Sequence, residues 1–75
     1  MLSYVFLDVD NIFKDDIKKE LKSFDFTVDE VKEISGKYNI LARVVTDNRF
    51  RLHKFIYDNI HNLTGVKKIK TFKVI

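Results

Sequence analysis

The stretch that decides the fold is LSYVFLDV, residues 2–9. Side chains alternate between the two faces of a β-strand, and both alternating sets are largely apolar here. One set is Leu2, Tyr4 and Phe6, and the other is Val5, Leu7 and Val9. Both faces of such a strand have to be covered, so its packing partners determine the rest of the architecture.

Two segments have the residue spacing of amphipathic helices. In residues 15–24 the apolar side chains recur three or four positions apart, and acidic residues stand at the positive end of the helix dipole. A second helix is predicted to begin at Asp47 or Asn48, either of which can cap it, and to reach about Leu63 before Gly65 ends it. Its apolar stripe consists of Leu52, Phe55, Ile56, Ile60 and Leu63.

Three further segments are rich in residues that favour strands. Residues 28–36 and 38–46 are predicted to pair antiparallel, because Gly36 between them can take the positive φ of a tight hairpin. The second of these segments is apolar on both faces, with Arg43 interrupting the face of Leu41 and Val45. Residues 67–75 alternate basic and apolar side chains and are predicted to form the last strand.

The order βαββαβ predicts an α+β, ferredoxin-like fold. Right-handed crossovers place both helices on one face of a four-stranded antiparallel sheet. The chain has no proline and only two glycines, so residues 1–75 are predicted to be a single domain without a linker. The opposite face of the sheet keeps large apolar groups, and pairing of two sheets face to face, as in a dimeric α/β barrel, would cover them.

Composition also favours self-association. At 75 residues a single core only marginally offsets the entropy of folding, and no cysteine is present to form disulfides. The charge of +3 is a mild excess spread along the chain. Abundant Lys and Ile with few Gly suits a thermophile. No apolar run approaches the length of a membrane span, and the start of the chain is acidic, so a cytoplasmic location without membrane contact is expected.

Two blocks of sequence resemble the effector domain of the Lrp/AsnC transcriptional regulators, also called the regulation-of-amino-acid-metabolism domain. Residues 34–41, ISGKYNIL, are similar to the family's hydrophobic-Thr-Gly-x-Tyr-Asp hairpin, with Asn39 at the position of the Asp. Residues 63–71, LTGVKKIKT, are similar to its hydrophobic-Pro-Gly-Val segment, with Thr64 at the position of the Pro. The helix-turn-helix of the family's regulators is absent, so the chain resembles a stand-alone module.

The resemblance implies an amino-acid effector bound around the hairpin, in a crevice where one dimer meets another. Ser35, Gly36, Lys37 and Tyr38 are the candidate donors to the carboxylate, and Asn39 is a candidate acceptor from the ammonium. Asp47 is a further candidate near the crevice. The alternative interpretation is that Gly36 and Asn39 only serve the turn and that Asp47 only caps a helix.

The resemblance also implies partners. A homodimer, which can assemble further into a ring of dimers, and co-assembly with full-length Lrp/AsnC regulators are expected. Direct DNA binding and a cofactor are not expected. The predicted function is therefore an oligomeric, amino-acid-sensing regulatory module.

Three other functions are weighed against this one. Catalysis is disfavoured, because Asp8 and Asp10 lie at a strand end without a partnering nucleophile or base. His53 and His61 are eight positions apart, which is too far to share a metal on one helix. RNA binding is the main rival and would use the following residues of the sheet: Tyr4, Phe6, Phe72, Lys67, Lys68, Lys70 and Lys73.

One observation favours a dimer over RNA binding, which stays the alternative. The third strand offers the aliphatic Ile40, Ala42 and Val44 where an RNA-binding sheet would offer aromatic residues. These aliphatic residues favour a dimer interface. Arg43 is either an ion-pair partner across that interface or a residue at its rim.

Overall fold

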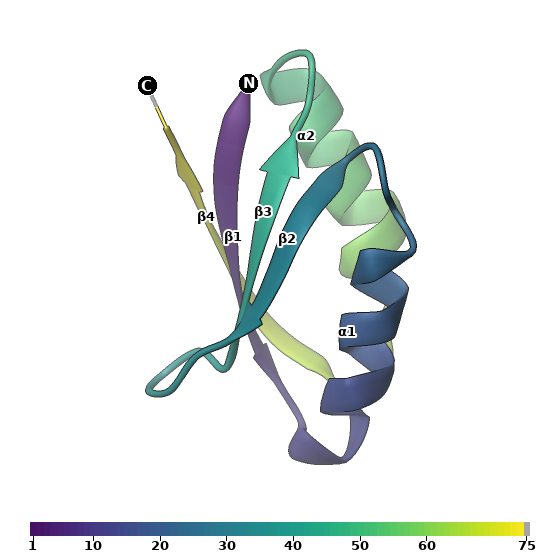
Figure 1. The fold of residues 1–75 in the computed structure, drawn as a ribbon, viewed down its shortest axis with the longest axis vertical. Helices are drawn as coiled ribbons and strands as arrows, with labels where there is room; N and C mark the ends of the chain where they lie inside the picture. Colours follow the sequence, from purple (N-terminus) through teal and green to yellow (C-terminus); the bar gives the residue numbers. More distant parts are fainter. Residues whose placement is uncertain (75) are drawn as a thin grey trace.

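The computed structural model, which describes residues 1–74, is a four-stranded antiparallel sheet with both helices on one face (Figure 1). The order of strands across the sheet is β2-β3-β1-β4. The strands are β1 (Leu2–Val9), β2 (Val28–Glu33), β3 (Ile40–Val45) and β4 (Val66–Lys73). The helical elements are η1 (Asn11–Phe13), α1 (Lys14–Lys22), α2 (Arg49–Phe55) and η2 (Ile56–Ile60). The predicted ferredoxin-like fold is confirmed.

The core lies between the sheet and the two helices. The register pairs Val5 with Ala42 and Leu7 with Ile40, so the buried residues of β1 and β3 share the face under the helices. This corrects the assignment of the third strand, because its aliphatic residues belong to the core and not to a surface that a partner would cover. Those residues are Ile40, Ala42 and Val44, and none has exposed surface.

The other face of the sheet, here called the open face, is not covered by a helix. Alternation along β1 places Leu2, Tyr4 and Phe6 there, each of them half-buried. The same alternation along β3 places Leu41, Arg43 and Val45 there. The predicted apolar character of both faces of β1 is therefore confirmed, and the open face is the part of it that one chain leaves accessible.

The first helix is shorter than predicted. The 3₁₀ turn η1, in which the Asp10 carboxylate accepts from the Ile12 N–H at 3.2 Å, precedes α1. α1 ends at Lys22 and buries Ile17 and Leu21. Phe24 lies beyond its end and still reaches the core, where its ring meets that of Phe55 edge to face at 5.2 Å.

The second helix departs from regular geometry. Asn48 caps it, because its side-chain oxygen accepts from the Arg51 N–H at 2.9 Å, and Asp47 does not. The helix then widens into the π-helical turn η2, where the His61 N–H donates to the Ile56 carbonyl at 2.8 Å. Regular helix was predicted to about Leu63. The predicted stripe still packs inward, with Leu52 and Ile60 buried.

Two glycines take positive φ values for different reasons. Gly36 has φ 113° in the hairpin loop, and a Cβ there would meet open space. Gly65 has φ 96° before β4, and a Cβ there would lie 2.7 Å from the Cβ of Phe13. The Gly65 carbonyl also accepts from the Asp10 N–H at 2.8 Å. Gly65 therefore lets the end of β1 and the start of β4 approach each other closely.

Substitution of the two glycines should separate backbone strain from close packing. Gly36→Ala is expected to cost about 1–2 kcal/mol of unfolding free energy, because only the left-handed backbone is strained. Gly65→Ala adds overpacking against Phe13, which typically costs about 1–3 kcal/mol more. Urea unfolding followed by circular dichroism measures both. Equal losses in the two variants would contradict the close approach at Gly65.

Candidate functional site

The predicted donors Ser35, Gly36, Lys37 and Tyr38 lie in the loop 34–39 between β2 and β3. Both strands are shorter than predicted, and the Ile34 N–H closes the loop by donating to the Asn39 carbonyl at 3.1 Å. The loop projects beyond one end of the sheet, and Ser35, Gly36 and Lys37 are exposed (Figure 1). Within residues 1–74 none of these four N–H groups donates a main-chain hydrogen bond. They are accessible donors for an anionic group.

The side chain of Tyr38 turns toward the open face. Its ring centroid lies 6.1 Å from that of Phe6, and the ring of Phe6 meets Phe72 edge to face at 5.4 Å. The ammonium of Lys70 lies 5.5 Å from the centroid of the Phe72 ring. Phe6, Tyr38 and Phe72 are here called the aromatic cluster, and this cluster connects the hairpin to the open face.

Asn39 pairs with the main chain of Val9. Its side-chain oxygen accepts from the Val9 N–H at 2.9 Å, and its Nδ2 donates to the Val9 carbonyl at 2.9 Å. The amide imitates a peptide group of a neighbouring strand and fixes the hairpin to the end of β1. An aspartate could accept from the N–H but could not donate to the carbonyl. The Asn39 oxygen retains a second lone pair, so acceptance from an effector's ammonium stays a prediction.

Asp47 lies at the opposite end of β3 from the hairpin. It is exposed in a shallow pocket that it shares with Phe26, Thr27, Thr46 and Arg51. Seven residues, the six of β3 and Thr46, separate it from Asn39, a distance on the order of 25 Å in an extended chain. One chain therefore does not bring Asp47 together with the loop residues, and a site that uses both needs two copies.

Acidic residues of β2 form ion pairs with α1 and with β3. Glu33, at the end of β2, meets the ammonium groups of Lys18 at 2.7 Å and Lys14 at 3.7 Å. The hydrogen bond from Lys18 lowers the pKa of Glu33 and raises the pKa of Lys18 itself. On the open face, Arg43 Nε lies 3.5 Å from Asp29, close enough for an ion pair but without hydrogen-bond geometry. Arg43 thus has an acidic neighbour in its own chain.

Neither a metal site nor a membrane-spanning helix is found among the residues described. Within residues 1–74, no three His, Cys, Asp or Glu side chains gather as metal ligands would. His53 and His61 are both exposed. The His61 ring stacks on the Tyr57 ring, with 5.6 Å between the two ring centroids. In the same part of the chain, no helix combines the length and apolar character needed to cross a membrane.

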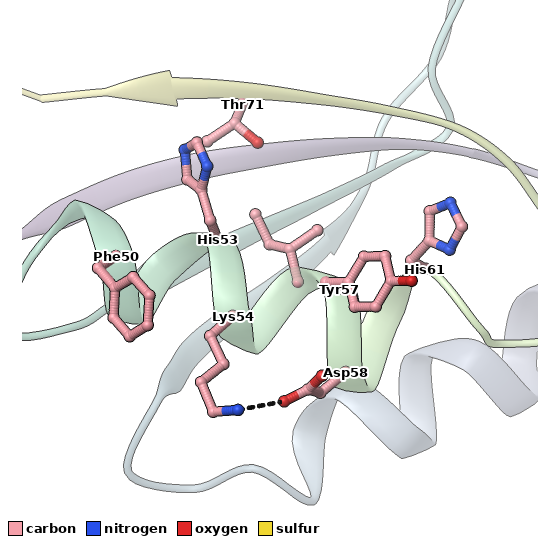
Figure 2. Close-up of a pocket in the computed structure, with 8 residues that line it drawn as sticks. Phe50, His53, Lys54, Tyr57, Asp58, His61 and Thr71 are labelled. Carbon is pink, nitrogen blue, oxygen red and sulfur yellow. Dashed lines mark ion pairs between the residues drawn. The ribbon is translucent and has the colours of Figure 1, made fainter.

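A groove that the sequence did not lead us to expect lies beside α2, η2 and β4 (Figure 2). Phe50 and Tyr57 line it, and about seven-tenths of each side chain is exposed. A signal for the groove was present in the sequence. Two large aromatic residues seven positions apart lie outside the core stripe of the second helix, and such residues have no role in packing the core.

The comparisons with known proteins agree with this geometry. Residues 5–75 match the model of the Lrp/AsnC ligand binding domain. The structure of FFRP-DM1 is similar at a TM-score of 0.91 and 19% identity, covering 99% of this chain and 97% of that one. AsnC of E. coli is similar at a TM-score of 0.90 and 17% identity, covering 99% and 50%. No curated protein matches the chain by sequence.

A transcriptional regulatory protein of the AsnC family from Pyrococcus furiosus has the higher identity of 28%, at a TM-score of 0.79. The alignment covers 95% of this chain and 48% of that protein. The chain therefore spans nearly all of FFRP-DM1 and about half the length of the two AsnC regulators.

The role of Asn39 can be tested by Asn39→Asp. The variant should lose about 1–3 kcal/mol at neutral pH, because the Val9 carbonyl loses its donor and faces a carboxylate. Burial beside that carbonyl raises the pKa of the introduced carboxyl. The protonated form can donate again, so the deficit should shrink as the pH falls toward about 4. Urea unfolding at both pH values measures it.

The matched control is Asn62→Asp. The Asn62 amide also donates to a carbonyl, that of Tyr57 at 3.3 Å, but it does so at an exposed position. The Asn62→Asp variant should lose no more than about 0.5 kcal/mol of unfolding free energy at either pH. Equal losses of unfolding free energy in the two variants would contradict a special role for Asn39.

Proposed function

The chain belongs to the family of Lrp/AsnC ligand-binding domains, and on that premise we propose that it senses an amino acid as an oligomeric regulatory module. The observation that carries the proposal is the match over residues 5–75. The family's domain serves regulation and not catalysis. The proposed module assembles through the open face and binds its effector at the hairpin.

Assembly follows from the open face. Tyr4, Phe6 and Phe72 form its centre, since the register pairs Tyr4 with Phe72 next to Phe6. Phe72 and Val45 remain more than two-fifths exposed in a single chain. Covering such groups is favourable by about 25 cal/mol per Å² of apolar area. A second copy placed face to face covers the apolar groups of both copies at once, and Arg43, which lies opposite Tyr4 in the sheet, enters this interface together with its neighbour Asp29.

The effector site requires more than one copy. Within a chain the loop 34–39 and Asp47 lie at opposite ends of the sheet. A ring of dimers brings the loop of one dimer against a neighbouring dimer. The free N–H groups of the loop and the Lys37 ammonium then bind the effector's carboxylate, and the Asn39 oxygen or Asp47 of another copy accepts from its ammonium.

Co-assembly is the regulatory output that fits this arrangement. Full-length regulators of the family contain the same kind of domain, so their open faces can pair with that of this chain. The effector then acts by changing which assemblies are populated. Direct DNA contact by residues 1–75 is not part of this proposal.

Binding of single-stranded RNA is the second candidate function. The aromatic cluster with Lys70 over the Phe72 ring favours it, because bases stack on such rings while lysines meet phosphates. RNA and a second copy compete for the same open face. Salt-sensitive RNA binding by a monomer would therefore replace the dimer in this proposal.

The dimer can be tested by light scattering. The chain of 8.9 kDa should have twice that mass as a dimer, or a higher even multiple of it as a ring of dimers, at micromolar concentration. Phe6→Glu removes an apolar contact worth about 1.5–3 kcal/mol from each copy, so the dissociation constant should rise roughly 100-fold or more. Phe50→Glu, the same change on α2 away from the open face, is the control. A monomeric native chain would contradict the dimer.

The effector can be tested by thermal unfolding in the presence of each of the twenty amino acids. A bound amino acid at ten times its Kd should raise the Tm by about 5–10 °C. Lys37→Glu should abolish the shift, whereas Lys22→Glu, which makes the same charge change on α1, should preserve it. If none of the twenty raises the Tm, the hairpin does not sense a free amino acid.

A further inference from the structure

The second helix carries an outer stripe in addition to the stripe that packs into the core. Leu52 and Ile60 face the sheet and are buried, whereas about seven-tenths of Phe50 and of Tyr57 is exposed. Four exposed residues, here called the α2 seam, form the outer stripe: Phe50, Lys54, Tyr57 and His61. Helical geometry places them on the side opposite the core stripe, and Figure 2 shows Phe50 and Lys54 projecting away from β4. Pairing of two open faces therefore leaves the α2 seam accessible.

The wide turn η2 extends this outer surface. A π turn holds more residues than an α turn, so residues four positions apart come close to one line along the helix. Tyr57 and His61 are such a pair, and their rings stack with an interplanar angle of 15°. The aromatic surface that begins at Phe50 thus continues to the end of the helix, and π turns of this kind are frequent at functional sites.

The spacing of the α2 seam is the same in both directions. Its residues lie four, three and four positions apart along the chain, and residues three and four apart form the ridges by which helices pack on one another. An antiparallel copy of this ridge would place Phe50 opposite His61 of the second copy. Lys54 would then lie opposite Tyr57 of the second copy. Each pair occurs twice about a twofold axis, so the seam is self-complementary, as a contact between identical copies requires.

The charge of the α2 seam also fits a second copy. The Lys54 ammonium would lie over the Tyr57 ring of the second copy, where a cation is attracted to the aromatic face, and beside Asp58 of that copy. Within one chain Lys54 and Asp58 pair at 3.2 Å, so with neutral histidines this surface carries no net charge, although the chain carries +3. A neutral surface does not repel its own copy and gives an acidic or basic partner no charge to select.

We propose that the α2 seam pairs with the α2 seam of a second copy as an antiparallel pair of helices. Each open-face dimer presents two such seams and joins other dimers through them. The inference goes beyond the proposed function, because the α2 seam contains no residue of the open face or of the loop 34–39 that the effector site uses.

The test follows the mass of the full chain by sedimentation equilibrium as its concentration rises. A contact between two short helices is small for a protein interface, so open-face dimers should associate through it with a Kd on the order of 100 μM. Amide signals of residues 50–61 should shift over the same range in ¹⁵N-edited NMR spectra. Phe50→Glu, which leaves the open face unchanged, should weaken this association at least about tenfold.

Two charge variants give a sharper test. Lys54→Glu makes both charged positions acidic, and Asp58→Lys makes both basic, so neither variant should associate through the α2 seam by itself. An equimolar mixture of the two should associate again, because opposite charges then face each other across the contact. Mixing would not reverse a merely structural effect of either substitution on its own helix.

The matched control places the same charge changes on α1. Lys22 and Glu20 are both exposed there, and Lys22→Glu and Glu20→Lys should each keep the association of the native chain, alone and mixed. The α2 seam is also measured independently of the open face. If the open-face dimer does not form, pairing of seams leads from monomer to dimer and not from dimer to tetramer.

Three results would overturn the proposal. Equal association of the native chain and Phe50→Glu would show that the α2 seam takes no part in it. A mixture of the two charge variants that associates no better than either alone would exclude the antiparallel pairing. If copies stay apart while a helical peptide with leucines four, three and four positions apart shifts the amide signals of Phe50 and Tyr57, the occupant is a helix of another protein.

Discussion

The apolar character of β1 on both of its faces is the constraint on which the rest of this structure depends. β1 pairs with β3 on one side and β4 on the other, and α1 and α2 cover one of its faces so completely that Val5 and Leu7 have no exposed surface. Two helices suffice for one face of a four-stranded sheet. The aromatic cluster around Phe6 remains on the other face, so the proposed self-association has its physical origin in the sequence of a single strand.

Periodicity predicted the elements of the fold well and their ends poorly. Strand and helix patterns extend over many residues, so the apolar spacing of β1, α1 and β4 was sufficient. Which face of β3 is buried depends on register against β1, a long-range property, and Ile40 was therefore assigned to the wrong surface. No local residue choice in the sequence indicates the π turn that begins at Ile56.

The candidate site was predicted in part for a related reason. The hairpin could be located because Gly36 and its neighbours form a local motif, but the pairing of Asn39 with Val9 joins residues thirty positions apart. The same motif reading placed Asp47 near the loop, although β3 separates the two within one chain. The groove beside β4 escaped notice because Phe50 and Tyr57 become neighbours of Thr71 only in three dimensions.

Hydrogen bonds at one corner of the sheet, at the end of β1, connect the hairpin loop to the start of β4. Asn39 holds both main-chain groups of Val9, and the next N–H, that of Asp10, donates to Gly65 at the start of β4. The register of β1 against β4 also shifts at Asp8 and Val9. An effector that draws on the Asn39 oxygen would act on this corner and, through it, on β4. Transmission would require the corner to have two arrangements, and the pairing of β1 with β4 is already irregular at Val9.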